Sequence, residues 1–167
     1  MGEATSRIEN GKFFSAYRLL DSHLSELCND AKRHDMDRPF TATARGHRLF
    51  KIVQQDPYMR RDFQKPRGYA GDAVMLDCVY DGLAPRCTSA LGLECFAGTT
   101  RGPMGLSVLL RRCLLRAYLD QCVTDGEQYR ILPIASGHCH ELQGSLVTKS
   151  EFQGEFVALD QNVKSCD

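Results

Sequence analysis

The C-terminal part of the chain constrains the fold most strongly. A short apolar run over residues 130–135 precedes a turn at Gly137, and a second apolar run, residues 156–159, ends at Asp160. Runs of this length between polar residues predict buried strands, and residues 141–149 between them are compatible with a helix. The order strand, glycine turn, helix, strand and acid predicts a βαβ unit, whose two parallel strands end at the same edge of a sheet.

The same order indicates a nucleoside-binding site. In such units the turn backbone approaches the ligand, and the acid after the second strand accepts hydrogen bonds from ribose hydroxyls. Asp160 follows Gly137 by about 20 residues, as this fingerprint requires. However, Gly137 is the one glycine present where the full fingerprint has three. The spacing therefore leaves two interpretations open, a nucleoside-binding unit and an ordinary α/β unit.

A second motif, Lys-Pro-Arg-Gly-Tyr-Ala-Gly-Asp at residues 65–72, lies directly before an apolar stretch. Gly68 and Gly71 allow backbone angles or close approaches that a side chain would prevent. Asp72 is placed to cap the helix that the pattern predicts over residues 74–80. A simple turn and cap would need fewer special residues, so we interpret the motif as the wall of a pocket.

Helical periodicity dominates the rest of the chain. Apolar residues recur at helical spacing over residues 12–34, 46–55 and 106–123, which predicts three amphipathic helices. Residues 81–105 contain five glycines and two prolines. This composition predicts a loop, either a mobile lid or a connecting segment.

Composition excludes several classes of partner. The 21 basic and 21 acidic residues cancel, which removes the electrostatic basis for binding nucleic acid or an anionic membrane surface. We find no apolar run of membrane-spanning length and no signal peptide in the sequence. None of the eight cysteines forms a C-x-x-C pair, so free thiols in a reducing cytoplasm are expected. These features predict a cytoplasmic protein.

Several segments together resemble bacterial class I S-adenosylmethionine-dependent methyltransferases, in the subgroup with a helical N-terminal region related to 3-hydroxypalmitate methyl ester biosynthesis proteins. The resemblance covers roughly residues 50 to 162. Its most specific parts are residues 56–58, 65–77 and 79–80, while residues 135–141 and 158–161 are similar to the first and second methyltransferase motifs of the group.

The resemblance implies an α/β fold. A helical N-terminal region, residues 1–125, would precede the first βαβ unit of a Rossmann-like methyltransferase sheet, residues 126–167. Complete sheets of this class continue with further strands, so the chain looks like the N-terminal portion of an enzyme. We therefore expect the chain alone to be inactive.

The resemblance also assigns roles to individual residues. S-adenosyl-L-methionine would be the cofactor, held by Gly71, Gly137, Glu141 and Asp160. Tyr69 and Asp72 would form a wall over the cofactor and act on the acceptor side as catalytic residues. Three positions depart from the expected pattern: His140 replaces an arginine, Asn162 replaces a second acid, and Pro133 interrupts the first strand.

His138-Cys139-His140 raises the question of a metal site, because imidazole and thiolate are good zinc ligands. Residues so close in sequence rarely reach one metal together, and no paired cysteines stand nearby in the sequence. We therefore expect no metal.

Two functions follow. The first is methyl transfer from S-adenosylmethionine to a small-molecule or fatty-acid-like acceptor. The alternative is a non-catalytic helical interaction module that retains a methyltransferase-like remnant, as the departures at Pro133 and His140 indicate. The alternative predicts an exposed apolar patch and self-association through an unpaired sheet edge.

Overall fold

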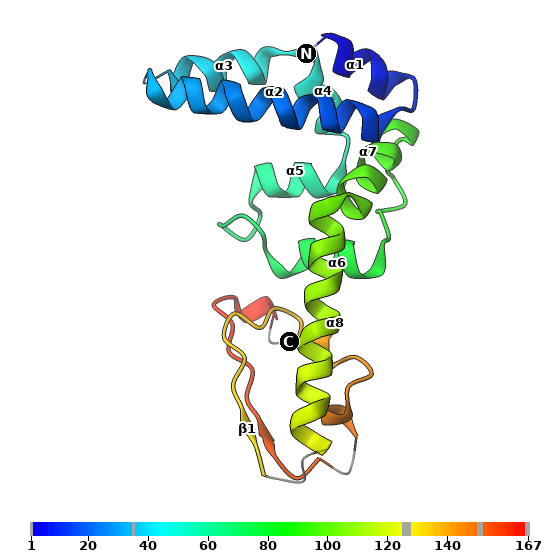
Figure 1. Cartoon of the computed structure of the whole chain (residues 1–167), viewed down its shortest axis with the longest axis vertical. Coiled ribbons are helices and arrows are strands. Elements are labelled where there is room, and N and C mark those ends of the chain that lie inside the picture. Colours follow the sequence, from blue (N-terminus) through cyan, green and yellow to red (C-terminus); the bar gives the residue numbers. More distant parts are fainter. Residues whose placement is uncertain (1, 35, 125–127, 150–151, 166–167) are drawn as a thin grey trace. The chain divides into compact units, whose positions relative to one another are not determined.

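The computed structural model describes residues 2–34, 36–124, 128–149 and 152–165. The chain divides into two compact units, coloured by sequence in Figure 1. Unit 1 comprises Met1–Gln64 and Ala84–Gly102, and unit 2 comprises Lys65–Leu83 and Pro103–Asp167. The predicted domain boundary between residues 125 and 126 lies outside the described residues.

Unit 1 is helical throughout its regular structure. Its helices are α1 (Gly2–Glu9), α2 (Phe13–Arg33), α3 (Asp37–Gly46), α4 (Arg48–Val53), α5 (Pro57–Gln64) and α7 (Ala90–Arg101). The long α2 and the shorter α3 lie side by side (Figure 1). The helices predicted over residues 12–34 and 46–55 are confirmed as α2 and α4, because amphipathic periodicity is a local signal.

The core of unit 1 is built from small and medium apolar side chains. It consists of Ala4, Ile8, Ala16, Leu49, Ile52 and Cys95. Alanines on α1 and α2 allow these helices to pack closely. Burial raises the pKa of the Cys95 thiol to about 11, so Cys95 behaves here as a small apolar residue.

Helix α7 contradicts the prediction of a loop over residues 81–105. Ser89 caps α7 by accepting a hydrogen bond from the Gly92 amide at 3.0 Å. Gly92 also lies so close to the Gln55 carbonyl oxygen that a Cβ atom there would collide with it. Glycine in a helix costs about 1 kcal/mol relative to alanine, and here it permits close packing. The glycines that suggested a loop include one that fits the helix to its neighbour.

Asp56 connects two elements of unit 1. It is 1% exposed and precedes α5, where its Oδ1 accepts a hydrogen bond from the Tyr58 amide at 2.8 Å. Its Oδ2 accepts one from the Thr99 hydroxyl of α7 at 2.7 Å. With Pro57 in the first helical position, Asp56 therefore caps α5 and also fastens it to α7.

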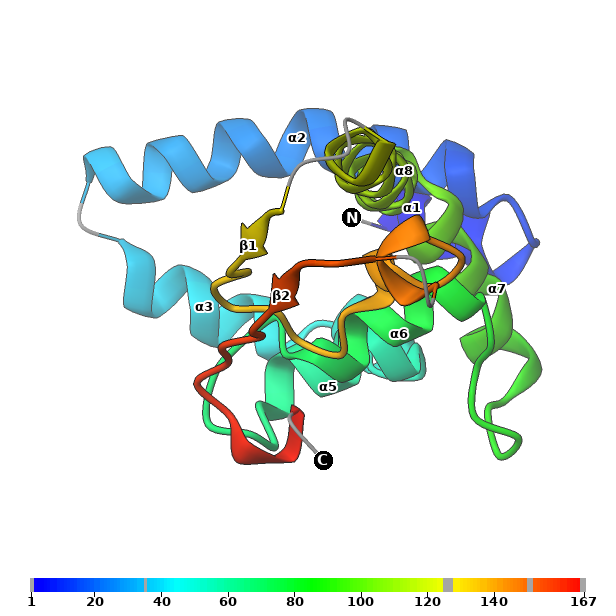
Figure 2. The same ribbon diagram turned by 90° about the horizontal axis from the view of Figure 1, so that it is seen from below.

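Unit 2 contains α6 (Ala73–Asp81) and the longer α8 (Pro103–Thr124). These confirm the helices predicted over residues 74–80 and 106–123. Two short parallel strands, β1 (Arg130–Ile131) and β2 (Glu155–Phe156), run side by side (Figure 2). The remaining elements are the 3₁₀ turns η1 (His140–Leu142), η2 (Leu146–Thr148) and η3 (Val163–Ser165).

The prediction of an α/β fold with a Rossmann-like βαβ unit is wrong. The described chain is mainly helical, and the one sheet found in it has two strands of two residues each. Two 3₁₀ turns replace the helix predicted over residues 141–149, because Gly144 between them adopts a left-handed φ of 75°. A parallel pair this short is not the sheet of a Rossmann-like domain.

Pro133 explains why the strands are so short. Its carbonyl accepts a hydrogen bond from the Leu159 amide at 3.0 Å, but proline has no amide hydrogen to donate in return. Regular pairing therefore stops after Ile131, and a single parallel bridge between Ile134 and Leu159 continues the contact. The prediction that Pro133 interrupts the first strand is confirmed.

Asp120 fastens the segment after η1 to α8. Its Oδ1 accepts hydrogen bonds from the Ser145 hydroxyl and the Leu146 amide, both at 2.7 Å. These bonds, the Ser145 bond first, lower the pKa of the Asp120 carboxyl.

Among the described helices, none combines the length and apolar character needed to cross a membrane.

Candidate functional site

The turn after β1 is joined to the end of the second strand segment by a carboxylate. The Gly137 amide donates to Asp160 Oδ2 at 2.8 Å, and the Asn162 amide donates to Oδ1 at 2.8 Å. The bonds from Asn162 and then Gly137 are the main causes that lower the pKa of Asp160. Asp160 therefore stays ionised at neutral pH, beside a backbone turn at the carboxyl end of two parallel strands.

Every second residue in this turn has a left-handed backbone. The φ angles are 56° at Ala135, 56° at Gly137 and 50° at Cys139. A positive φ costs glycine little, but it costs other residues about 1–2 kcal/mol each. The strain at Ala135 and Cys139 must be balanced by surrounding contacts, and such strain is concentrated at functional sites in proteins.

The start of α6 packs against this turn. A Cβ atom at Gly137 would lie 3.3 Å from the Cβ of Ala73, the first residue of α6. The structure thus brings the motif at residues 65–72 next to the Gly137 turn. Asp72 occupies the N-cap position of α6 and is 1% exposed, although its side chain makes no capping hydrogen bond to the helix.

The two glycines of the motif serve its backbone conformation. Gly68 has a φ of 86° and Gly71 a φ of 70°, and a Cβ atom at either position would meet no atom within 4 Å. The prediction of special backbone angles is confirmed, and close approach is not their role. Tyr69, between them, is half-buried.

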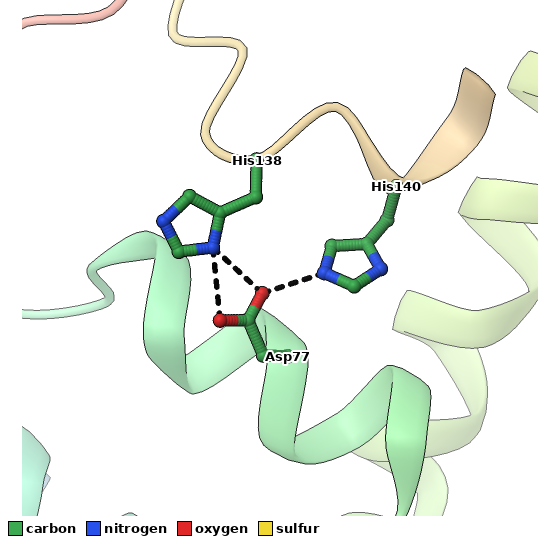
Figure 3. Close-up of side chains that lie close together, drawn as sticks. All are labelled: Asp77, His138 and His140. Atoms are coloured by element: carbon green, nitrogen blue, oxygen red, sulfur yellow. Dashed lines mark hydrogen bonds and ion pairs between the residues drawn. The ribbon is translucent and has the colours of Figure 1, made fainter. Parts of the chain in front are cut away.

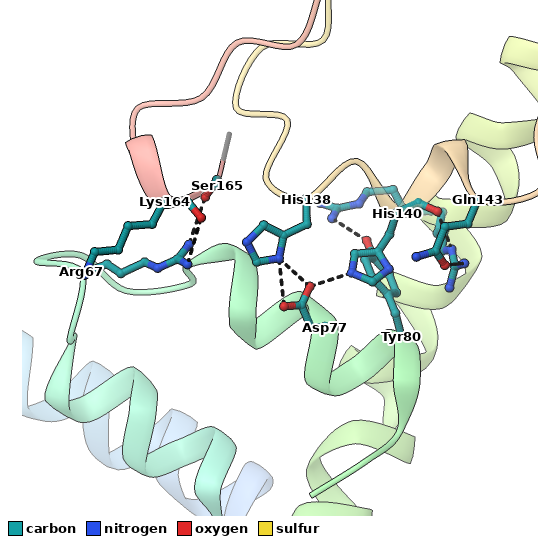
Figure 4. Close-up of polar contacts among 10 residues, drawn as sticks. Arg67, Asp77, Tyr80, His138, His140, Gln143, Lys164 and Ser165 are labelled. Carbon is teal, nitrogen blue, oxygen red and sulfur yellow. Dashed lines mark hydrogen bonds and ion pairs between the residues drawn. The ribbon is translucent and has the colours of Figure 1, made fainter. Parts of the chain in front are cut away.

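Arg67 belongs to the site although sequence reasoning assigned it no role. Its guanidinium donates to the Ser165 hydroxyl at 2.9 Å (Figure 4). Ser165 in turn hydrogen-bonds Asp160, and both Ser165 and the Arg67 charge help to lower the pKa of that carboxyl. Arg67 lies within the motif at residues 65–72, and its place in that motif is the sequence signal that could have identified it. The motif therefore contributes a positive charge to the surroundings of Asp160.

A cavity of about 400 Å³ lies within unit 2. Apolar side chains from α6, α8 and both strand segments form most of its wall, with polar groups from Arg111, Ser136 and Glu141. Of the predicted site residues that the structure describes, Glu141 lines this cavity. The Gly137 backbone, Asp160 and the Tyr69–Asp72 segment lie outside its lining.

A separate cluster of polar side chains surrounds Asp77 of α6. Its carboxylate oxygens both lie 2.9 Å from Nδ1 of His138, and Oδ1 lies 2.6 Å from Nε2 of His140 (Figure 3). The side chain of His140 is 10% exposed, and those of His138 and Asp77 are 26% and 25% exposed. Sequence reasoning considered the two histidines without Asp77, which is 61 residues before His138.

Aromatic and cationic groups hold His140 in place. Its ring centroid lies 4.9 Å from that of Tyr80, and its backbone carbonyl accepts a hydrogen bond from Arg112 at 3.0 Å. The Arg112 guanidinium also lies 5.0 Å from the centre of the Tyr80 ring and donates to Gln143. Figure 4 shows Tyr80 and Gln143 beside His140, whose ring is hydrogen-bonded to Asp77.

Comparison of the chain with protein-family models, with curated proteins and with solved structures finds no match.

Proposed function

We propose that this chain is part of an S-adenosylmethionine-dependent methyltransferase, with the cofactor held at the Gly137 turn and Asp160. The observation that carries the proposal is the 2.8 Å hydrogen bond between the Gly137 amide and the Asp160 carboxylate. This bond places a backbone donor and an ionised acid side by side where two parallel strands end. Nucleoside ligands use these two groups, the first through backbone approach and the second through ribose hydroxyls.

The surrounding contacts support this assignment. Backbone strain at Ala135 and Cys139 is concentrated at the turn, and Ala73, which directly follows the motif at residues 65–72, packs against Gly137. The proposal needs no complete Rossmann-like sheet. It requires the turn, the acid and the wall, all of which belong to unit 2.

The cavity of unit 2 suits the acceptor better than the cofactor. Its wall is mainly apolar, and Arg111 and Glu141 add one charge of each sign. An apolar, fatty-acid-like acceptor would bury its hydrocarbon part among the leucines and place a polar group near Arg111. Methyl transfer needs donor and acceptor held in line in a dry site, so the protein's main contribution is positioning. Tyr69 and Asp72 do not line this cavity, so an acceptor-side role for them requires an acceptor that extends beyond it.

Asp160→Asn tests the cofactor assignment. The amide keeps the size of the side chain but removes the charge that ribose hydroxyls would contact. Hydrogen bonds to a charged group contribute about 1.5–3 kcal/mol, so affinity for S-adenosylmethionine should fall about tenfold or more. Saturation-transfer NMR with millimolar cofactor is suited to weak binding by the chain alone.

Asp81→Asn is the matched control, because Asp81 is an exposed aspartate of the same unit. This control should bind the cofactor like the unchanged chain. Circular dichroism would establish that both variants retain their helices. No saturation transfer from the unchanged chain to the cofactor, or equal binding by Asp160→Asn, would overturn the proposal.

A second candidate function is self-association through the strand pair. Leu132, Ile134, Val157 and Leu159 are 57%, 74%, 48% and 54% exposed. Four large apolar side chains on two adjacent strand segments form a surface patch of the kind that mediates protein contacts. This observation favours the interaction module as the alternative to an enzyme.

Ile134→Lys tests self-association. A lysine at this exposed position should repel a second copy and shift the chain toward monomer, without loss of core packing. Sedimentation equilibrium of the unchanged chain should show dimers that the variant lacks. Leu83→Lys is the control, because Leu83 is equally exposed at 74% but lies outside the strand pair. If the unchanged chain stays monomeric at high concentration, this second proposal is refuted.

A further inference from the structure

The geometry points to a divalent transition-metal site formed by Asp77, His138 and His140. The three potential ligand atoms all lie within 4.8 Å of one another. Figure 3 shows both imidazole rings turned toward the same carboxylate. Asp77 belongs to α6, His138 to the turn that leads into η1, and His140 is the first residue of η1. This site is independent of the proposed methyltransferase activity.

The ligand set is one that zinc and related metals bind. Two imidazole nitrogens and one carboxylate oxygen suit Zn²⁺, Co²⁺ and Fe²⁺. Metal-to-nitrogen bonds of about 2.1 Å place neighbouring ligand atoms about 3.4 Å apart in a tetrahedron. The present separations between carboxylate oxygen and ring nitrogen are 2.6 and 2.9 Å. Binding therefore requires the carboxylate oxygen to move away from each ring nitrogen by less than about 1 Å.

Charge also favours a cation at this position. Within the described part of the chain, the Asp77 carboxylate is in hydrogen-bond contact with His138 and His140 and forms no ion pair with a lysine or arginine. Neutral imidazoles leave the carboxylate charge uncompensated, and a divalent ion would neutralise it. Arg112, which contacts His140, donates to the His140 carbonyl and to Gln143.

The orientation of His140 is fixed on the side that faces Asp77. Its Nδ1 atom is buried and has no hydrogen-bond partner among the described residues. The ring keeps this orientation through Nε2 and through its contact with Tyr80. Nε2 of His140 and Nδ1 of His138 would bind the metal, leaving the proton of each neutral ring on its other nitrogen.

Three protein ligands leave at least one coordination position for water or a small ligand, as in catalytic zinc sites. The bound ion would also connect α6 to the turn that contains Gly137. Because the ion would bind the folded chain preferentially, it should raise the thermal stability of the chain.

Titration of the full chain with Zn²⁺ after chelator treatment tests the site. Isothermal calorimetry should show one equivalent bound, with a dissociation constant on the order of 1 µM or tighter. Asp77→Asn and His138→Gln should each weaken binding by more than about 100-fold, since even residues that only orient a metal ligand contribute 10- to 100-fold. His23→Gln is the control on an exposed histidine and should bind Zn²⁺ normally.

Cobalt distinguishes this site from binding by cysteines. Co²⁺ held by histidine and carboxylate should give weak visible bands without the strong near-ultraviolet absorption of a cobalt–thiolate bond. This measurement uses the unchanged chain, so it remains decisive if a variant fails to fold. Thiolate absorption, no bound Zn²⁺, or undiminished binding by Asp77→Asn would each overturn the proposal.

Discussion

Gly92→Ala should lower the free energy of unfolding of unit 1 by about 2 kcal/mol. The added methyl group would collide with the Gln55 carbonyl oxygen and lie 2.9 Å from Cγ2 of Thr88. Overpacking of this kind costs roughly 1–3 kcal/mol or more. The better helix propensity of alanine returns about 1 kcal/mol of that loss. Backbone atoms cannot rotate away, so the higher part of the range applies.

Gly46→Ala is the matched control for this prediction. Gly46 is also a helical glycine of unit 1, and a methyl group there would meet no atom within 4 Å. Its unfolding free energy should stay within about 1 kcal/mol of the unchanged chain. Hydrogen exchange of amides in α4 and α7 would report both effects locally. If Gly92→Ala protected these amides as well as Gly46→Ala, the packing argument would be wrong.

Asp56→Ala should destabilise unit 1 by about 2–3 kcal/mol, because the buried carboxylate that accepts from the Tyr58 amide and the Thr99 hydroxyl, and so connects α5 to α7, is lost. Asp56→Asn should be much milder. The asparagine oxygen can still accept from Tyr58, and its amide can donate to the Thr99 oxygen. The Thr99 hydroxyl would keep its hydrogen bond to the Cys95 carbonyl.

Asp56→Asn and the unchanged chain should also differ in how their stability depends on pH. Burial is the main cause that raises the pKa of Asp56 above its ordinary value of 3.8. The folded state therefore holds the proton more tightly than the unfolded state, and stability falls as pH rises from about 4 through the folded pKa. The Asp56→Asn variant has no titrating group at this position, so it does not lose this stability as the pH rises. Urea unfolding should show Asp56→Asn gaining on the unchanged chain between pH 4 and pH 7. A gain in the opposite direction would contradict the raised pKa.

The long helices could be predicted because their signal is local. The apolar periodicity of residues 12–34 and 106–123 identifies α2 and α8 without knowledge of their neighbours. The prediction of a loop over residues 81–105 was wrong because the role of its glycines depends on contacts with distant residues. Gly92 favours a loop in isolation, and its close approach to Gln55 is visible only in three dimensions. The Rossmann-like sheet failed because Pro133 interrupts the pairing of its first strand.

The candidate sites divide in the same way. Gly137 and Asp160 could be proposed together from the sequence, because parallel strands end at a common edge. The cluster of Asp77, His138 and His140 could not, since Asp77 precedes the two histidines by more than 60 residues in sequence. Spacing within the short His138–His140 segment argued against a metal. The third ligand comes from another element, and local spacing carries no information about it.

The burial of Cys95 makes its thiol much less reactive than the thiols of the exposed cysteines. With a pKa of about 11, roughly one Cys95 thiol in ten thousand is ionised at pH 7, and oxidants and alkylating agents attack the thiolate. Cys28, Cys87 and Cys113 are exposed and meet such agents directly. Oxidative damage would therefore accumulate on the surface while the core of unit 1 stays reduced, and Cys95 becomes reactive when α7 opens.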